Sequence, residues 1–161
     1  MTCYSIYVMM IKKSYNYINW NNVSKDNKLV YKYANLYKNK LNWRIISLFH
    51  RHTEQFLITF QDYIVWNFIN LYNYNFSESF INQFQDKLDW TWIGCRQQLS
   101  IPFIRQFKDK LNWDILSQYQ LLNEALIIEF ADKVNWDYIY LYQWLSKKFK
   151  HKHKAKLHLA I

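Results

Sequence analysis

The stretch FIRQFKDKLNWDILS at residues 103–117 decides the fold, because related stretches return along the chain at a nearly constant interval. The clearest marker of this interval is a tryptophan, which closes phrases such as Leu111-Asn112-Trp113. Six tryptophans recur with spacings of 23 or 24 residues: Trp20, Trp43, Trp66, Trp90, Trp113 and Trp136. A fixed period of this length is typical of repeat architectures. A residue is therefore a candidate for function only if it departs from the repeat pattern.

Apolar residues around each tryptophan follow a helical spacing. An aliphatic residue lies three positions after the tryptophan in all six copies, and an aromatic residue lies six positions before it in five of them. In the stretch above these residues are Leu116 and Phe107, and Phe103 and Ile104 lie about one turn further back. Offsets of three and four residues place side chains on one face of an α-helix. The pattern predicts short amphipathic helices, with each tryptophan buried at the joint between successive repeats.

Two helix starts are predicted in each repeat. Asn or Asp precedes the tryptophan in five of six copies, and both are preferred N-cap residues. Val65 is the exception, so we expect a weaker cap before Trp66. Thirteen residues before the tryptophan, the four best copies carry a second N-cap: Thr53, Ser77, Ser100 and Asn123. In three of these copies a glutamate follows, which places a negative charge where the helix dipole favours it.

These features predict an all-α solenoid of about six short helical-hairpin repeats. We expect a single domain over residues 1–161, with a degenerate N-terminal cap at 1–14, repeats at 15–145 and a basic C-terminal capping helix at 146–161. Met10 and Ile11 of the predicted cap fall in register with Phe103 and Ile104. Hydrophobic residues make up 51% of the chain, which allows a substantial core. A single Gly and a single Pro argue against a β protein, whose turns need both.

The last predicted helix differs from the others in its charge. Ser146 takes the cap position, but Lys150 and His153 fall where other copies are apolar. A terminal repeat has no following neighbour, so a polar outer face is expected there. Six lysines with no acid among them supply six of the nine net positive charges: Lys147, Lys148, Lys150, Lys152, Lys154 and Lys156. They are the candidate binding residues for nucleic acid or an acidic partner. The plainer interpretation, which a bare charge run favours, is a solvated cap.

An Asp-Lys pair recurs before three of the tryptophan phrases, at 86–87, 109–110 and 132–133. The lysines fall near the predicted end of the second helix, where a cation suits the helix dipole. We interpret these pairs as solvated surface charges. The alternative is a polar binding ladder along the repeats.

No set of residues points to catalysis. Gly94 is the single glycine, so the glycine-rich loops that bind phosphates are excluded, and no nucleophile–base or paired-carboxylate arrangement stands apart from the repeat. Cys3 and Cys95 show no metal or disulfide spacing and are consistent with a reducing, intracellular compartment. The histidines lack cysteine or carboxylate company, and lysines beside them would repel a cation: His50, His52, His151, His153 and His158. The sequence predicts no enzyme, catalytic residue, cofactor, metal or membrane span.

Residues 103–117, together with Phe80 to Trp90 and Phe130 to Ile139, resemble a degenerate repeat in multicopy proteins of large DNA viruses of the mimivirus type. The resemblance covers most of residues 20–145 and is clearest from 53 to 141. The first two copies depart from it, with Ala34 in place of the aliphatic residue nine before Trp43. The resemblance implies a helical repeat and a viral source, hence a location in the host cytoplasm or nucleus. It implies no settled activity, so no site residue is carried over.

The function expected from these features is a repeat-based protein–protein interaction or scaffold module. Solenoids present surfaces built from equivalent positions of each repeat. Aromatic residues recur six positions after the tryptophan, at Tyr72, Tyr119 and Tyr142, where they are candidates for such a surface. One alternative is binding of nucleic acid or an acidic partner through the basic terminal helix. Another is a relic repeat copy without a specific function.

Overall fold

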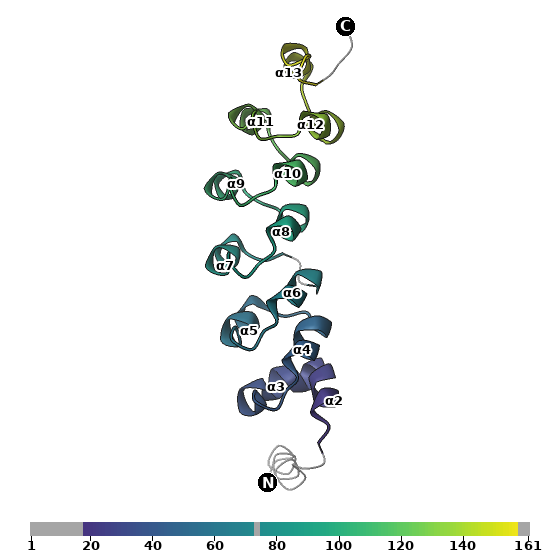
Figure 1. Cartoon of the computed structure of the whole chain (residues 1–161), viewed down its shortest axis with the longest axis vertical. Coiled ribbons are helices and arrows are strands. Elements are labelled where there is room, and N and C mark those ends of the chain that lie inside the picture. The colour runs from purple at the N-terminus through teal and green to yellow at the C-terminus, as the bar shows by residue number, and fades with distance from the viewer. Residues whose placement is uncertain (1–17, 73–74, 158–161) are drawn as a thin grey trace. The chain divides into compact units, whose positions relative to one another are not determined.

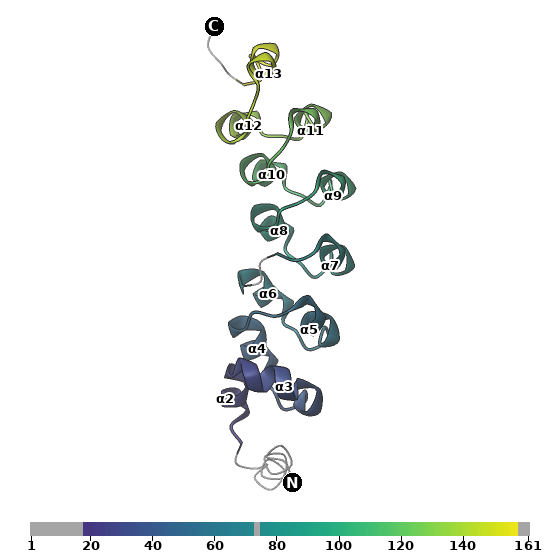
Figure 2. The ribbon, with the colours of Figure 1, turned by 180° about the vertical axis from the view of Figure 1, so that it is seen from behind.

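The computed structural model describes residues 18–72 and 75–157, and every regular element in those ranges is a helix, as the sequence predicts. Figure 1 shows these helices and Figure 2 shows them from behind. The helices that begin at a recurring tryptophan, here called Trp helices, are α2 Trp20–Lys25, α4 Trp43–Phe49, α6 Trp66–Tyr72, α8 Trp90–Arg96, α10 Trp113–Tyr119 and α12 Trp136–Tyr142. The second helices are α3 Asn27–Tyr37, α5 Glu54–Thr59, α7 Glu78–Gln83, α9 Ile101–Gln106, α11 Glu124–Glu129 and α13 Lys147–Lys152. The chain is therefore a helical repeat protein.

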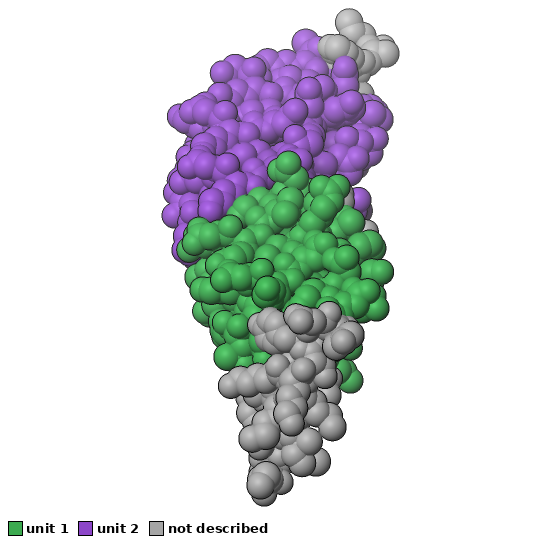
Figure 3. Space-filling model, turned by 60° about the horizontal axis from the view of Figure 1, so that its bottom comes forward, with its two compact units in different colours: residues 1–72 green, residues 73–161 purple. Residues whose placement is uncertain are grey.

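The chain divides into two compact units, residues 1–72 and 73–161, which Figure 3 colours separately. Within the first unit α4 packs against both α2 and α6, and within the second α10 packs against both α8 and α12. Both ribbon views show the Trp helices of the second unit in one row and α7, α9 and α11 in another. The single domain over 1–161 and the continuous solenoid stay predictions. The predicted cap at 1–14 lies outside the described residues, as do Cys3, His158 and Leu159.

Both predicted helix starts are confirmed. Asn112 precedes α10, and its Oδ1 accepts hydrogen bonds from the backbone N–H groups of Asp114 and Ile115 at 3.0 and 3.2 Å. Ser100 precedes α9, and its Oγ accepts from the N–H of Phe103 at 3.3 Å. These bonds satisfy N–H groups that a helix start leaves without an intrahelical acceptor.

The first repeat differs from the sequence pattern. Its second helix, α3, has 11 residues, whereas the other second helices have six. It starts early because Asp26 acts as the N-cap, its Oδ1 accepting from the N–H of Leu29 at 3.1 Å. Val30, Tyr33 and Ala34 are buried along one side of it. Ala34, which departs from the repeat pattern, is thus a core residue of a longer helix.

The prediction that every recurring tryptophan is buried was wrong. Trp43 and Trp113 are buried, but Trp20, Trp66, Trp90 and Trp136 are only half-buried. Five of the aliphatic side chains three positions later are among the residues with no exposed surface: Ile46, Ile69, Ile93, Leu116 and Ile139. In these five repeats the aliphatic residue is more deeply buried than the tryptophan, whereas Val23 of the first repeat is only half-buried.

The recurring indoles share one hydrogen bond, whether they are buried or half-buried. In five of the six tryptophans the Nε1 donates to the backbone carbonyl five residues earlier, in the turn that precedes the Trp helix, as Trp113 does to Lys108 at 2.8 Å. The same bond recurs at 2.7 to 3.1 Å for Trp43, Trp66, Trp90 and Trp136. The indole therefore closes a turn at the edge of the core, because its N–H must find an acceptor when it leaves water.

We expect Trp113→Ala to lower the free energy of unfolding by about 3–5 kcal/mol, the usual effect of truncating a large core aromatic. Trp113 is buried, and its ring lies 4.5 Å from that of Phe130. Urea unfolding followed by circular dichroism measures the change. Trp136→Ala serves as the comparison and should cost less, because Trp136 is only half-buried. Equal losses from the two variants would contradict the difference in burial.

Candidate functional site

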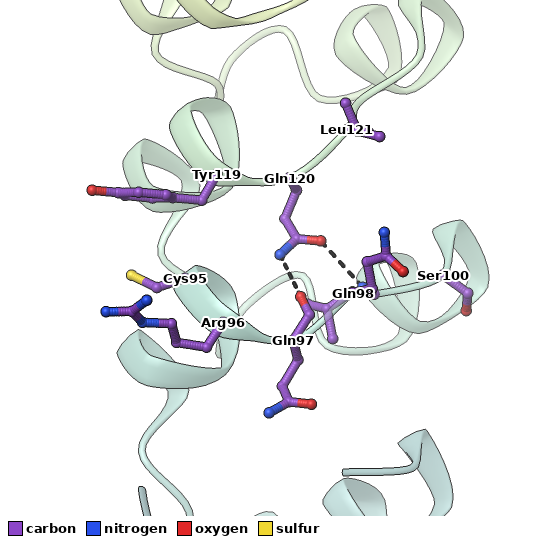
Figure 4. A pocket seen from close by; sticks show the side chains of 9 residues that line it. Cys95, Arg96, Gln97, Gln98, Ser100, Tyr119, Gln120 and Leu121 are labelled. Atoms are coloured by element: carbon purple, nitrogen blue, oxygen red, sulfur yellow. Dashed lines mark hydrogen bonds between the residues drawn. The ribbon is translucent and has the colours of Figure 1, made fainter. Parts of the chain in front are cut away.

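Buried glutamines recur in the second unit, and the side chains of Gln120 and Gln143 link successive repeats. They lie seven residues after the tryptophan, at Gln97, Gln120 and Gln143. The Nε2 of Gln120 donates to the backbone carbonyls of Gly94 at 2.8 Å and Gln97 at 2.7 Å, and its Oε1 accepts from the N–H of Leu99 at 3.1 Å. Figure 4 shows Gln120 reaching from one repeat to the backbone of the preceding one. Gln143 repeats the arrangement one period later. This role was not predicted, although the recurrence of glutamine at an interval of 23 residues signals it.

Histidine takes the same place in the first unit. His50 is buried, and its Nε2 donates to the carbonyl of Ser24, 26 residues earlier, at 2.7 Å. His52 is buried too and donates from Nε2 to the carbonyl of Ile46 at 2.9 Å. Burial lowers the pKa of His52 from 6.5 to about 4, although the bond to Ile46 acts in the opposite direction. Within the described residues no group of His, Cys, Asp and Glu is arranged to hold a metal ion.

Buried serines four residues after the tryptophan make a second connection. The Oγ of Ser117 donates to the carbonyl of Trp113 at 2.7 Å and accepts from the N–H of Asn135, in the next repeat, at 3.0 Å. Ser24 makes the same pair of bonds. Gly94 takes this position in α8, where a Cβ atom would lie 3.1 Å from Cγ2 of Ile115. The single glycine is therefore explained by close helix packing.

The glutamates that follow the second N-caps also act between repeats. The carboxylate of Glu78 accepts from the backbone N–H and the Oγ of Ser100, the N-cap 22 residues later, at 2.6 and 2.9 Å. Glu124 accepts from the N–H of Ser146 in the same way at 2.6 Å. From the sequence, these glutamates were expected only to place a negative charge in the first turn, where the helix dipole favours it. Its hydrogen bonds show that it also anchors the next repeat's cap.

The Asp-Lys pairs form ion pairs between successive repeats. Lys110 pairs with Asp86, and Lys133 pairs with Asp109, each with an N–O distance of 2.9 Å. The hydrogen bond from Lys133 holds the pKa of Asp109 below its usual value. Both lysines lie in the turns after α9 and α11, beyond the helix ends where they were placed from the sequence. They act as links between repeats within the second unit.

Apart from these links, large apolar side chains remain exposed at the ends of α10 and α12 and just after each helix. We call this set the apolar column, and its members lie six and eight residues after the tryptophan: Tyr119, Leu121, Tyr142 and Trp144. Their exposed fractions are 56%, 79%, 48% and 92%. The two tyrosines were candidates from the sequence, whereas Leu121 and Trp144 were missed. The side chain of Tyr72, the third candidate, lies outside the described part of the structure.

A hollow of about 470 Å³ adjoins the column between the chain segments that follow α8 and α10. Tyr119 and Leu121 contribute to its lining, together with Cys95, Arg96 and Gln98. Figure 4 shows Tyr119 and Arg96 extending on one side of Gln120 and Leu121 on the other. Cys95 is a free thiol whose pKa is raised by burial. The hollow is therefore a concave surface next to the apolar column, and it is lined in part by polar side chains.

The six candidate lysines divide into two groups. The Nζ of Lys150 lies 5.9 Å from the ring centre of Tyr140, and the Nζ of Lys156 lies 4.9 Å from that of Trp136. Lys156 takes the position that Lys110 and Lys133 hold in the earlier ion pairs. The remaining four have no such aromatic contact among the described residues: Lys147, Lys148, Lys152 and Lys154. None of the six forms an ion pair with an acid in the described part of the chain.

The predicted basic helix over 146–161 is shorter in the structure. Helix α13 ends at Lys152, and the chain continues in a turn as far as Leu157. His153 stands where earlier repeats carry phenylalanine, and its ring lies 4.6 Å from Phe149 and 5.8 Å from Trp136. It therefore packs as the replaced aromatic would.

The fold and these surfaces define a helical repeat protein with two exposed features in its second unit, the apolar column and the lysines of α13. No protein-family model matches the chain, and no curated protein or solved structure shows significant similarity to it. No helix among the described residues has the length and apolar character needed to cross a membrane.

We expect Gln120→Ala to lower the free energy of unfolding by about 2–3 kcal/mol, because it leaves buried backbone groups without a hydrogen-bond partner. Chemical denaturation measures this loss. Gln98→Ala is the matched control, since Gln98 is exposed and its truncation should be nearly neutral. A neutral Gln120→Ala would show that the bridge between repeats contributes little.

His52 should make stability fall as the solution is acidified. Its pKa is 6.5 when unfolded and about 4 when folded, so the unfolded chain binds the proton more readily. The stabilisation is complete above pH 6.5 and is lost between about pH 6.5 and 4, with a maximum near 3 kcal/mol. Urea unfolding at pH 7 and pH 4.5 tests this. His52→Gln should reduce the difference between the two values, whereas His151→Gln, at an exposed position, should leave it unchanged.

Proposed function

We propose that this chain is a repeat-based protein-binding module whose contact surface is the apolar column on α10 and α12. The observation that carries the proposal is the exposure of Trp144 and Leu121, at 92% and 79%. Leu121 and Trp144 hold the same position in successive repeats, and large apolar side chains that gather on a surface mark interaction sites. Tryptophan and tyrosine are also enriched among the residues that dominate binding energy.

The repeat supplies the spacing of this surface. Tyr119 and Tyr142 hold the same position in successive repeats, as do Leu121 and Trp144. Helices α10 and α12 pack against each other, so the two pairs follow one another along the unit. A partner would meet equivalent contacts at intervals of one repeat, which is how repeat proteins form extended binding surfaces. The adjoining hollow offers space for a side chain of the partner.

The polar side chains support binding rather than catalysis. Gln120, Gln143 and Ser117 are buried, and each is hydrogen-bonded to the backbone of a neighbouring repeat. Such groups hold the fold together and offer no spare donor or base for chemistry. The resemblance to viral repeat proteins adds the proposal that the partner is met inside an infected cell, in the cytoplasm or the nucleus.

The lysines of α13 favour a second candidate, binding of nucleic acid or an acidic partner. They form no ion pair with an acid among the described residues, and Tyr140 beside Lys150 is partly exposed. Phosphate contacts by lysines would make such binding fall steeply with salt. A relic copy without a function would show neither this binding nor a partner at the apolar column.

The apolar column is tested by the double variant Leu121→Ser, Trp144→Ser. Both side chains are exposed, so the variant should fold and unfold as the wild-type chain does. Affinity capture by the immobilised proteins, with quantitative mass spectrometry, should show a stoichiometric protein retained by the wild type and reduced about tenfold or more by the variant. Leu36→Ser is the matched control, because Leu36 is 63% exposed on α3 in the first unit. Equal retention by all three proteins would reject the column as the binding surface.

A further inference from the structure

Successive second helices of the second unit are joined by a polar bridge at one fixed position. The Nε2 of Gln106 on α9 donates to the Oδ1 of Asn82 on α7 at 3.2 Å. One repeat later, Arg105 on α9 forms an ion pair with Glu129 on α11 at 2.7 Å. Both pairs are separated by 24 residues and take the same place in the repeat. The groove between α7 and α9, which Asn82 and Gln106 help to line, is about 230 Å³.

The bridge is missing from the last pair of second helices, α11 and α13. The repeat places Ile128 and Lys152 at its two ends, and an isoleucine side chain can neither donate nor accept a hydrogen bond. The groove between these helices is about 540 Å³, more than twice the volume of the α7–α9 groove. Ile128 is left 44% exposed. The last groove is therefore open where the α7–α9 groove is bridged.

The lining of the open groove combines apolar and basic side chains. Ala125 and Ile128 from α11 and Phe149 from α13 supply the apolar part, and Lys148 and Lys152 from α13 are exposed. Glu124 is the one acid of the lining, and its Oε1 already accepts the N–H of Ser146. The two lysines make no ion pair with a described acid. The groove thus presents an apolar surface together with a net positive charge.

These properties select among possible occupants. A second copy of the chain would bring a further net charge of +9, which opposes docking on a lysine surface. Single-stranded nucleic acid is held by stacking on exposed rings. Here Phe149 is only 7% exposed, and the accessible apolar residue is the aliphatic Ile128. An acidic protein segment with aliphatic side chains matches both the charge and the apolar surface.

We propose that the α11–α13 groove binds a short acidic amphipathic helix of a protein partner. An apolar side chain of that helix would pack against Ile128 and Ala125, while its carboxylates pair with Lys148 and Lys152. Insertion of an amphipathic helix into a groove is a common mode of protein recognition. The inference rests on the proposed protein-binding function, but it uses a surface separate from the apolar column.

The test uses the full chain and a fluorescein-labelled helical peptide with Glu on one face and Leu on the other. Fluorescence anisotropy measures its Kd for the wild type and for the double variant Ile128→Asn, Lys152→Gln, which introduces the residues of the Asn82–Gln106 bridge. We expect this variant to raise the Kd about tenfold or more. Lys147→Gln removes the same single charge from α13 outside the groove and should raise it only about twofold.

Three comparisons separate the proposal from its alternatives. Lys148→Glu, an exposed substitution that leaves Ile128 intact, should also weaken binding, and thermal unfolding confirms that each variant is folded. If Lys147→Gln weakens peptide binding as much as the double variant does, the effect comes from charge alone, and the groove is rejected as the binding site. Tighter binding of an oligo-dT strand, lost in Lys148→Glu, would overturn the protein partner in favour of nucleic acid.

A separate measurement tests whether the peptide binds at the apolar column. Leu121→Ser, Trp144→Ser should leave the Kd of the peptide unchanged if the groove is its site. Loss of peptide binding in this variant but not in the Ile128→Asn, Lys152→Gln variant would overturn the groove and support the column. Failure of the wild type to bind the peptide would likewise overturn the groove, while leaving partner capture through the column as a separate result.

Discussion

Short helices leave many backbone groups without partners, and the described residues of this protein form almost only short helices. Apart from α3, the helices at 18–72 and 75–157 have six or seven residues, while each helix leaves four N–H groups and four carbonyls unsatisfied at its ends. Helices of this length are not stable alone in water. The requirement to satisfy these groups explains most of the recurring polar residues. Asn112 binds N–H groups at one helix start, Trp113 binds a turn carbonyl, and Gln120 binds the carbonyls of Gly94 and Gln97 in the preceding repeat.

This constraint also determines what the buried polar side chains do. A buried glutamine, serine or histidine in a cleft is often a candidate for chemistry, yet here Ser117, Gln120 and His50 all bind backbone groups of a neighbouring repeat. The features that are left as candidates for function lie where the repeat is incomplete or altered. Leu121 and Trp144 are exposed although nothing in the internal bonding requires them to be. The pair Ile128 and Lys152 replaces a bridge that earlier repeats make, and so opens a groove.

Whether a contact could be predicted from the sequence depended on how far apart its two residues lie along the chain. The caps Asn112 and Ser100 were predictable because each binds an N–H two or three residues away, so the pattern lies within one short stretch. The contacts that Glu78 and Gln120 make between repeats were not predicted, because their partners lie 22 or more residues away. The exposure of Trp144 was also missed, since its residue type is equally common in cores.

The sequence by itself determined the period, the helical class and the residue at which each Trp helix begins. These depend on local preferences, namely hydrophobic spacing and capping, which act over a few residues. The tertiary structure decided which side chains are buried and which links join the repeats. It placed Leu116 rather than Trp113 at the centre of its repeat, and it left the groove beside Ile128 open. Burial and bridging are properties of two repeats packed together, so they follow only when the positions of neighbouring helices are known.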